Sequence, residues 1–150
     1  MSNQLSPIFF KSISMVTATP DVELGTERVE SGEVYRYVYN GGTSASVGLG
    51  LTVPASGFAG LYTCSVSSAS GDLCMGFVKH VAIPSGEYGW VLKQGRVTVA
   101  IASSASTVAA GFVGLGANGV IATHSAGCAV GQLTTQIVSG NSGSLRVHLA

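Results

Sequence analysis

The sequence predicts an all-β protein, a single compact β-barrel or β-sandwich of short antiparallel strands preceded by an extended N-terminal arm. Runs rich in valine, isoleucine and tyrosine recur about every 8–12 residues, and glycine-containing turns separate them. In the clearest runs the larger apolar side chains fall at every second position, as on a strand with one buried face. No segment carries the apolar period of a convincing amphipathic helix. A chain of 150 residues forms one domain and buries a core without disulfides or metals.

The first 20 residues show no sustained period, and they contain two adjacent phenylalanines in the run Ile8, Phe9, Phe10 and Lys11. We expect an extended arm over residues 1–20 and a β-barrel domain over residues 21–150. Adjacent phenylalanines need a surface that covers them. The arm either lies on a neighbouring molecule or packs on its own domain as a strand that closes the barrel, and the sequence leaves both open.

The first hairpin is expected between residues 24 and 40. A strand over residues 25–30 and a return strand over residues 33–39 flank a turn at Ser31 and Gly32. Alternation places three aromatic side chains of the return strand on one face: Tyr35, Tyr37 and Tyr39. A face of tyrosines suits either a partly hydrated edge of the core or an interface.

The other expected strands are short. They cover residues 47–53, 60–66, 74–83, 111–115, 120–123, 129–137 and 144–149, with a loop over residues 102–110. Residues 85–101 hold the only tryptophan, Trp90, and take a central place in this prediction. Within them, Gly95 is predicted to join two short runs as a tight hairpin.

Charged residues are scarce and unevenly placed. They make up 9% of the chain, against about 25% in an ordinary soluble domain. Seven acidic and seven basic residues cancel, so we expect no binding to nucleic acid or to a membrane surface. Every carboxylate lies at or before Glu87, and the ionised side chains beyond it are Lys93, Arg96 and Arg146. This positive half either meets an acidic partner or reflects a small number of charges, and we favour the second interpretation.

The N-terminal residues and the cysteines indicate the cellular compartment in which the protein is made. The sequence shows no secretory signal, and its most apolar window is too short and too rich in glycine to span a bilayer. We expect synthesis in a cytoplasm. Cys64, Cys74 and Cys128 match no zinc pattern. Buried free thiols are favoured over a bridge between Cys64 and Cys74.

Two motifs that resemble cofactor or catalytic sites lack the context that those sites need. Residues 114–119 spell G-x-G-x-x-G, but a strand-like run follows them and no later carboxylate is present to hold a ribose. Residues 123–127 resemble a nucleophile elbow around Ser125, yet no acid follows to orient His148 as its base. The three histidines stand far apart in the sequence. We expect no enzymatic activity, no catalytic residue, no cofactor and no metal.

Short turn-and-strand patterns recur at residues 23–26, 32–38 and 88–91 with Gly95 and Val97, and in the closing segment 127–149. In these patterns the chain resembles the small head-decoration, or cement, proteins of tailed bacteriophages. The resemblance spans most of the chain after Asp21, and the longer serine- and alanine-rich middle departs from it. It implies a β-barrel or β-tulip domain that binds the outside of an assembled capsid. It also implies contact with the major capsid protein, commonly as a homotrimer, and a stronger shell.

The expected function is therefore that of a structural virion protein on the capsid exterior, made in the host cytoplasm. We name Ile8, Phe9, Phe10 and Lys11 as the candidate capsid interface, because ordering an arm is worthwhile only if large apolar groups become buried. The alternative is a receptor- or glycan-binding module of a virion surface or tail, in which Tyr35, Tyr37 and Tyr39 stack on sugars. A small hydrolase at Ser125 is the third class considered.

Overall fold

The computed structural model describes residues 11–53, 62–66, 73–100, 107–108, 111–115, 117–123, 130–134, 136–138 and 142–149. Within these ranges the chain forms strands and one short 3-10 turn but no α-helix, which confirms the predicted all-β class. Accordingly, the described part contains no helix that is long and apolar enough to cross a membrane.

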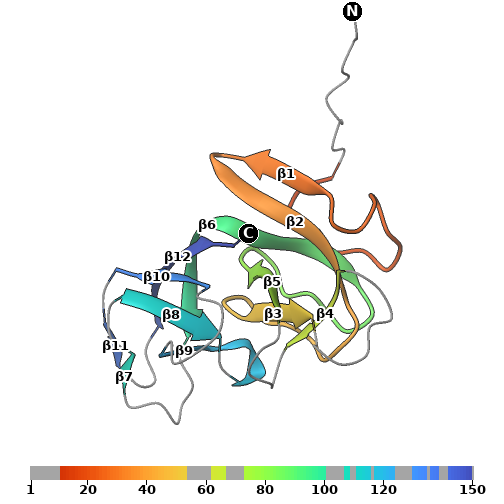
Figure 1. The fold of residues 1–150 in the computed structure, drawn as a ribbon. Coiled ribbons are helices and arrows are strands. Elements are labelled where there is room, and N and C mark those ends of the chain that lie inside the picture. Colours follow the sequence, from red (N-terminus) through yellow and green to blue (C-terminus); the bar gives the residue numbers. More distant parts are fainter. Residues whose placement is uncertain are drawn as a thin grey trace, which may run out of the picture.

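Twelve strands run in chain order through the described residues (Figure 1). They are β1 (Glu27–Glu30), β2 (Glu33–Asn40), β3 (Gly50–Val53), β4 (Thr63–Val66), β5 (Leu73–Val78), β6 (Tyr88–Ala100), β7 (Thr107–Val108), β8 (Gly111–Leu115), β9 (Ile121–Thr123), β10 (Gly131–Leu133), β11 (Ile137–Val138) and β12 (Ser142–His148), with the 3-10 turn η1 (Ala117–Gly119) between β8 and β9. The predicted hairpin of β1 and β2 is confirmed, with Glu30 paired to Glu33 across the turn.

Five of these strands close a barrel in the order β2, β4, β3, β5 and β6. The barrel closes because β6 pairs with β5 and also with β2. The pairing of β2 with β4 is parallel, whereas the other four pairings are antiparallel. Every strand of the barrel contributes to one core cluster, which consists of Val38, Ala45, Leu51, Val53, Cys64, Met75, Val78, Ile83 and Val91. This cluster therefore fills the barrel interior.

The predicted hairpin at Gly95 is wrong, because β6 continues through this residue as a strand of 13 residues. From Tyr88 to Gln94 the strand pairs with β2, and from Gln94 to Ala100 it pairs with β12. Gly95 has φ 144°, and the carboxylate of Glu33 lies 2.6 Å from the place that a Cβ atom would occupy. A glycine is thus needed where β6 leaves one partner strand for the next, and both halves keep their ladder bonds.

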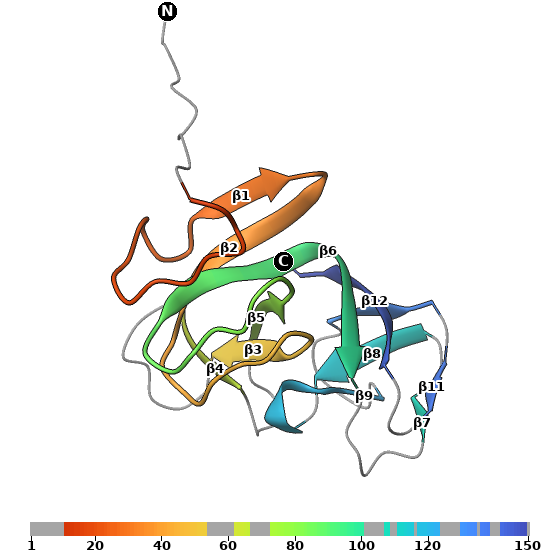
Figure 2. The same ribbon diagram turned by 180° about the vertical axis from the view of Figure 1, so that it is seen from behind.

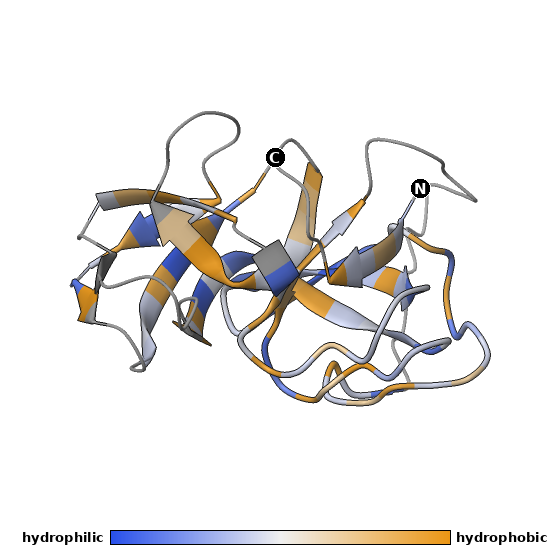
Figure 3. Ribbon diagram, turned by 90° about the horizontal axis from the view of Figure 1, so that it is seen from below, coloured by the Kyte–Doolittle hydropathy of each residue, from blue (hydrophilic) through white to orange (hydrophobic). Residues whose placement is uncertain are grey.

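The second half of β6 carries a further sheet in the order β6, β12, β10, β8 and β9. Seen from behind in Figure 2, these strands lie beside the barrel on the side away from the β1–β2 hairpin. Their buried side chains join Phe77 and Leu92 of the barrel strands in a second core cluster. This second cluster therefore lies between the barrel strands and the added sheet, and it is distinct from the cluster that fills the barrel. Figure 3 shows hydrophobic and hydrophilic residues alternating along several of these strands, as the period of two requires.

The described end of the predicted arm lies on the barrel. Thr17 forms an isolated antiparallel bridge with Tyr88, with backbone N to O distances of 3.0 and 2.8 Å. Ile13 is 7% exposed and belongs to the second core cluster. Ile8, Phe9 and Phe10 are outside the described residues. The boundary at residue 20 stays a prediction, but residues 11–20 pack on their own domain.

The tyrosine face of β2 is core rather than surface. Tyr35 and Tyr37 are each 1% exposed, and Tyr39 is only partly exposed. The ring of Tyr37 packs on Trp90 with a centroid distance of 5.0 Å. The proposal that Tyr35 and Tyr37 stack on sugars is therefore wrong, because no face of either ring is open to a ligand.

Two cysteines behave as small apolar residues, as predicted. Cys64 and Cys74 are buried free thiols with no disulfide between them. Burial raises the pKa of each thiol to about 12, so neither is a reactive thiolate at neutral pH. Cys128 lies outside the described residues.

Candidate functional site

One face of the added sheet carries an uninterrupted row of exposed side chains. Cross-strand pairing places Arg96 of β6 opposite Arg146 of β12, Arg146 opposite Gln132 of β10, and Gln132 opposite Phe112 of β8. Residues directly opposite each other in a sheet point to the same face. We call Arg96, Arg146, Gln132 and Phe112 the cross-strand row.

Strand alternation forces the row toward solvent. Most neighbours of its members along the strands are buried, among them Val97, Leu145, Leu133 and Val113. All four members of the row are exposed, and Phe112 is 70% exposed. Because side chains alternate between faces, the burial of these neighbours fixes the outward direction of the row.

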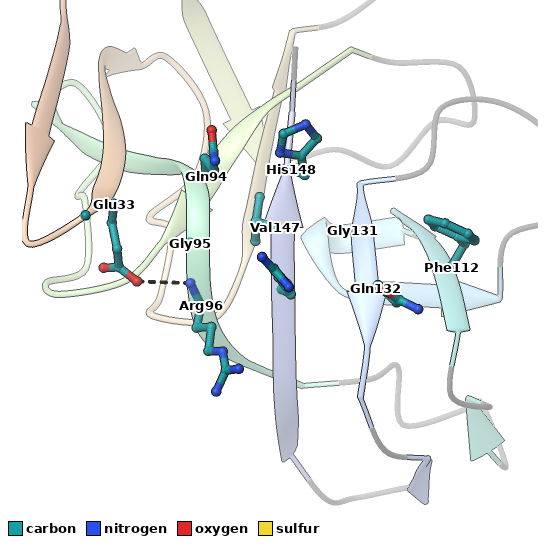
Figure 4. Close-up of a pocket in the computed structure, with 11 residues that line it drawn as sticks. Glu33, Gln94, Gly95, Arg96, Phe112, Gly131, Gln132, Val147 and His148 are labelled. Atoms are coloured by element: carbon teal, nitrogen blue, oxygen red, sulfur yellow. Dashed lines mark hydrogen bonds between the residues drawn. The ribbon is translucent and has the colours of Figure 1, made fainter.

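The row lines an open cleft of about 510 Å³ (Figure 4). In Figure 4, Gln132, Phe112 and His148 lie on neighbouring strands, and Glu33 and Arg96 lie on the other side of the cleft. His148 and Gln94 pair with each other across β12 and β6, so they form a second exposed pair two positions from the row. The cleft thus combines two arginines, two amides, a histidine and an exposed phenyl ring.

Glu33 is the one acid that lines this cleft, and its carboxylate is fully engaged. It accepts hydrogen bonds from the hydroxyl of Tyr35 at 2.6 Å, from Nζ of Lys79 at 2.5 Å and from the backbone amide of Arg96 at 3.0 Å. Burial acts to raise the pKa of Glu33, but these donors outweigh it and lower the pKa to about 2. Glu33 is therefore ionised at neutral pH. It holds β6 in place at the bend beside Gly95, where the strand passes from one partner strand to the next (Figure 4).

Glu33 makes the stability of the fold depend on pH. Its pKa falls from 4.5 to about 2 on folding, so its contribution is complete above about pH 4.5 and is lost as the pH falls toward 2. We expect the free energy of unfolding to drop by up to about 3 kcal/mol over this range because of Glu33. Urea unfolding of the wild type and of Glu33→Gln at a series of pH values checks this. Glu27, whose pKa is also lowered, adds a slope of the same sign, so the difference between the two proteins isolates Glu33.

A second polar cluster lies on the barrel and serves structure. Glu27 accepts hydrogen bonds from Nη2 of Arg36 at 2.9 Å and from Nζ of Lys93 at 2.7 Å. These two bonds lower the pKa of Glu27 despite the opposing effect of burial. Arg36 is 8% exposed and also donates to Sδ of Met75. The group neutralises a buried guanidinium.

Lys11 is the one described residue of the predicted capsid interface, and it lies outside this cleft. Lys11 is exposed, forms an ion pair with Asp21 at 2.6 Å, and accepts a hydrogen bond from Arg28 of β1 at its carbonyl oxygen. It does not line the cleft. Ile8, Phe9 and Phe10, the other members of the predicted interface, are outside the described residues.

The residues of the discounted motifs do not assemble a reactive centre in the described part of the chain. His80 bonds the hydroxyl of Tyr35 at 2.9 Å, and His148 lies at the cleft. Ser125 and His124 are outside the described residues. The turn η1 leads directly into strand β9, so no helix follows the glycine motif. No group of three His, Cys, Asp or Glu residues suited to a metal ion occurs among the described residues.

Sequence reasoning identified Arg96 and Arg146 as the charges of the C-terminal half but missed Phe112 and Gln132. The alternation of Leu145, Arg146, Val147 and His148 marks one strand face, yet it does not reveal which strands lie beside it. The row exists only through the register of four strands, and the pairing of β6 with β12 joins Arg96 to Arg146, which are 50 residues apart in the sequence.

Comparison with known proteins adds a likeness of fold. No protein-family model matches the chain, and the search of curated proteins finds no match. Among solved structures, the N base of head fiber gp8.5 in bacteriophage phi29 is similar, with a TM-score of 0.52 and 12% sequence identity. The similarity covers 75% of this chain and 92% of that chain. It therefore concerns the backbone arrangement of most of the chain.

Proposed function

We propose that this chain is a structural protein of a phage virion that binds the outer surface of the head and stabilises the shell. The observation that carries the proposal is the fold likeness to the N base of a phage head fiber, which extends over 92% of that base. The resemblance of the sequence patterns to phage head-decoration proteins supports the same location, the outer surface of the head. In this proposal the partner is the major capsid protein, the chain acts as a homotrimer, and no chemical reaction is involved.

The composition fits such a role. A protein that is repeated many times on a shell needs only a modest contact area per copy, because linked sites give retention through avidity. The small share of charged residues, 9%, and the 21 glycines allow backbone to approach a neighbouring subunit closely. Low charge also limits the desolvation cost of docking.

In this proposal the segment Ile8, Phe9, Phe10 and Lys11 docks on the capsid. The described residues that follow are tied to the barrel by the Thr17–Tyr88 bridge and by the burial of Ile13. A truncation that tests docking must therefore end before these contacts. Removing residues 1–10 does so, whereas removing all of residues 1–20 also removes part of the core.

Deletion of residues 1–10 is expected to reduce co-sedimentation with purified heads by at least about tenfold, because a hot-spot pair of buried aromatics contributes 2 kcal/mol or more. The matched control deletes residues 1–7 and keeps Ile8, Phe9 and Phe10. It should sediment with heads like the full chain. If the variant without residues 1–10 is retained on heads as well as the full chain, the segment Ile8, Phe9, Phe10 and Lys11 does not dock. If the full chain itself is not retained on heads, the proposed function is refuted.

A further inference from the structure

The strongest unassigned feature is the charge of the cross-strand row. Arg96 and Arg146 face each other directly, and like charges at such positions destabilise a sheet. None of the five ion pairs formed among the described residues includes either arginine. The nearby carboxylate of Glu33 already accepts from Lys79, whose charge balances it. The cleft therefore keeps a net positive charge that an anion would neutralise.

The remaining cleft residues indicate what else the ligand carries. Phe112 is the only large apolar side chain in the row, and it presents an open ring at one end. Gln132 stands between the ring and the arginines and offers both a donor and an acceptor. Strands lie about 4.8 Å apart, so the backbones of Phe112 and Arg146, two strands apart, are separated by about 10 Å across the sheet. This spacing suits a ligand made of a short chain of linked rings that carry polar groups.

We propose that this cleft binds a saccharide that carries a carboxylate, such as an oligosaccharide of uronic or sialic acid. Arg96 and Arg146 bind the carboxylate, for which the guanidinium fork has a matching geometry. Phe112 packs against the C–H face of a sugar ring, and Gln132 bonds ring hydroxyls. The cleft volume of about 510 Å³ lies in the range of small-ligand sites.

Two other acidic partners fit the cleft less well. A nucleic-acid strand is held through many phosphate contacts, whereas two arginines line this cleft and the chain has no net charge. An acidic protein surface requires a desolvated apolar centre with several aromatic or aliphatic anchors. The row offers one such anchor, at its end, and is otherwise polar.

The test titrates the full chain with trigalacturonic acid, trimannuronic acid and sialyllactose, by NMR and by calorimetry. At least one of the three is expected to bind, with shifts confined to the cleft and with an affinity that falls as salt is added. The methyl ester of the bound sugar keeps the rings but lacks the charge, and it should bind about tenfold more weakly or worse.

Substitutions in the cleft test which side chains contact the sugar. Arg146→Gln and Phe112→Ala should each weaken binding by about tenfold. Arg28→Gln removes one positive charge away from the cleft and is the matched control, with unchanged binding expected. Failure of all three sugars to bind at millimolar concentration, or equal binding of the methyl ester, would overturn the proposal.

The same variants separate this site from the proposed function. If Arg146→Gln loses sugar binding but still sediments with heads, both the saccharide site and the separate docking segment are supported. If no sugar binds and Arg146→Gln fails to sediment with heads, the row docks on the capsid and the saccharide proposal is refuted. Failure of the wild type to sediment with heads, together with sugar binding, would refute the proposed function alone.

Discussion

Replacing Phe77 with alanine is expected to lower the free energy of unfolding by about 4 kcal/mol. Phe77 lies on β5 with no exposed surface, and it belongs to the core cluster that also contains Val113 and Ile121 of the added sheet. Truncation would leave a cavity where barrel and sheet share their core, and close-packed neighbours relax only partly into such a space. Urea unfolding of the variant and the wild type measures the loss.

Phe112→Ala is the matched control for this change. Phe112 carries the same side chain on β8 but is 70% exposed, so its removal should change the free energy of unfolding by less than about 0.5 kcal/mol. The two substitutions thus separate a structural phenylalanine from a surface one. Equal destabilisation by both would contradict the assignment of Phe77 to a shared core.

The second large effect is expected for Glu33→Ala, a loss of about 3 kcal/mol in the free energy of unfolding. The substitution removes the acceptor of Lys79, of Tyr35 and of the Arg96 backbone amide at once. Lys79 is then left partly buried without its counter-ion, and the amide loses its partner at the bend of β6. Denaturant unfolding at pH 7 measures this loss.

Asp21→Ala provides the comparison for Glu33→Ala. It also breaks a lysine–carboxylate pair, but this pair is more open to solvent, because the Lys11 side chain is 46% exposed and the Asp21 side chain is 28% exposed. Surface pairs of this kind contribute less than about 1 kcal/mol. If Asp21→Ala and Glu33→Ala cost the same, Glu33 does not hold the bend as described.

Local patterns predicted the strands because alternation and turn residues act over short distances. The hairpin of β1 and β2 is the clearest case, since Ser31 and Gly32 adopt positive φ and tyrosines occupy every second position from Tyr35 to Tyr39. The same reasoning failed for the exposure of Tyr35 and Tyr37. Alternation identified their shared face, but it does not show what packs on that face. In the structure residues 11–24 and strand β6 cover it.

Gly95 shows why the long strand was not predicted. A glycine between two apolar runs has the same local pattern in a hairpin as in a strand that changes partners. The two cases differ in what lies alongside, here β2 on one half of β6 and β12 on the other. Those partners are separated from β6 by many residues, so no short window of sequence contains them.

The cross-strand row was out of reach for the same reason. Arg96 and Arg146 were recognisable as charges without nearby acids, but their direct opposition is a property of the β6–β12 register. Phe112 resembles an ordinary core residue of a strand until the burial of Val113 assigns it to the outer face. Function at such a site depends on tertiary register, whereas the fold class depends on patterns within single segments.

Cryo-electron microscopy of purified phage heads incubated with the full chain is the most direct test of whether the chain binds the outer surface of the head. If the proposed function is right, barrel-sized density is expected on the outer surface of the shell, as homotrimers of this chain in contact with the major capsid protein. Heads that remain bare at saturating protein concentration would contradict it.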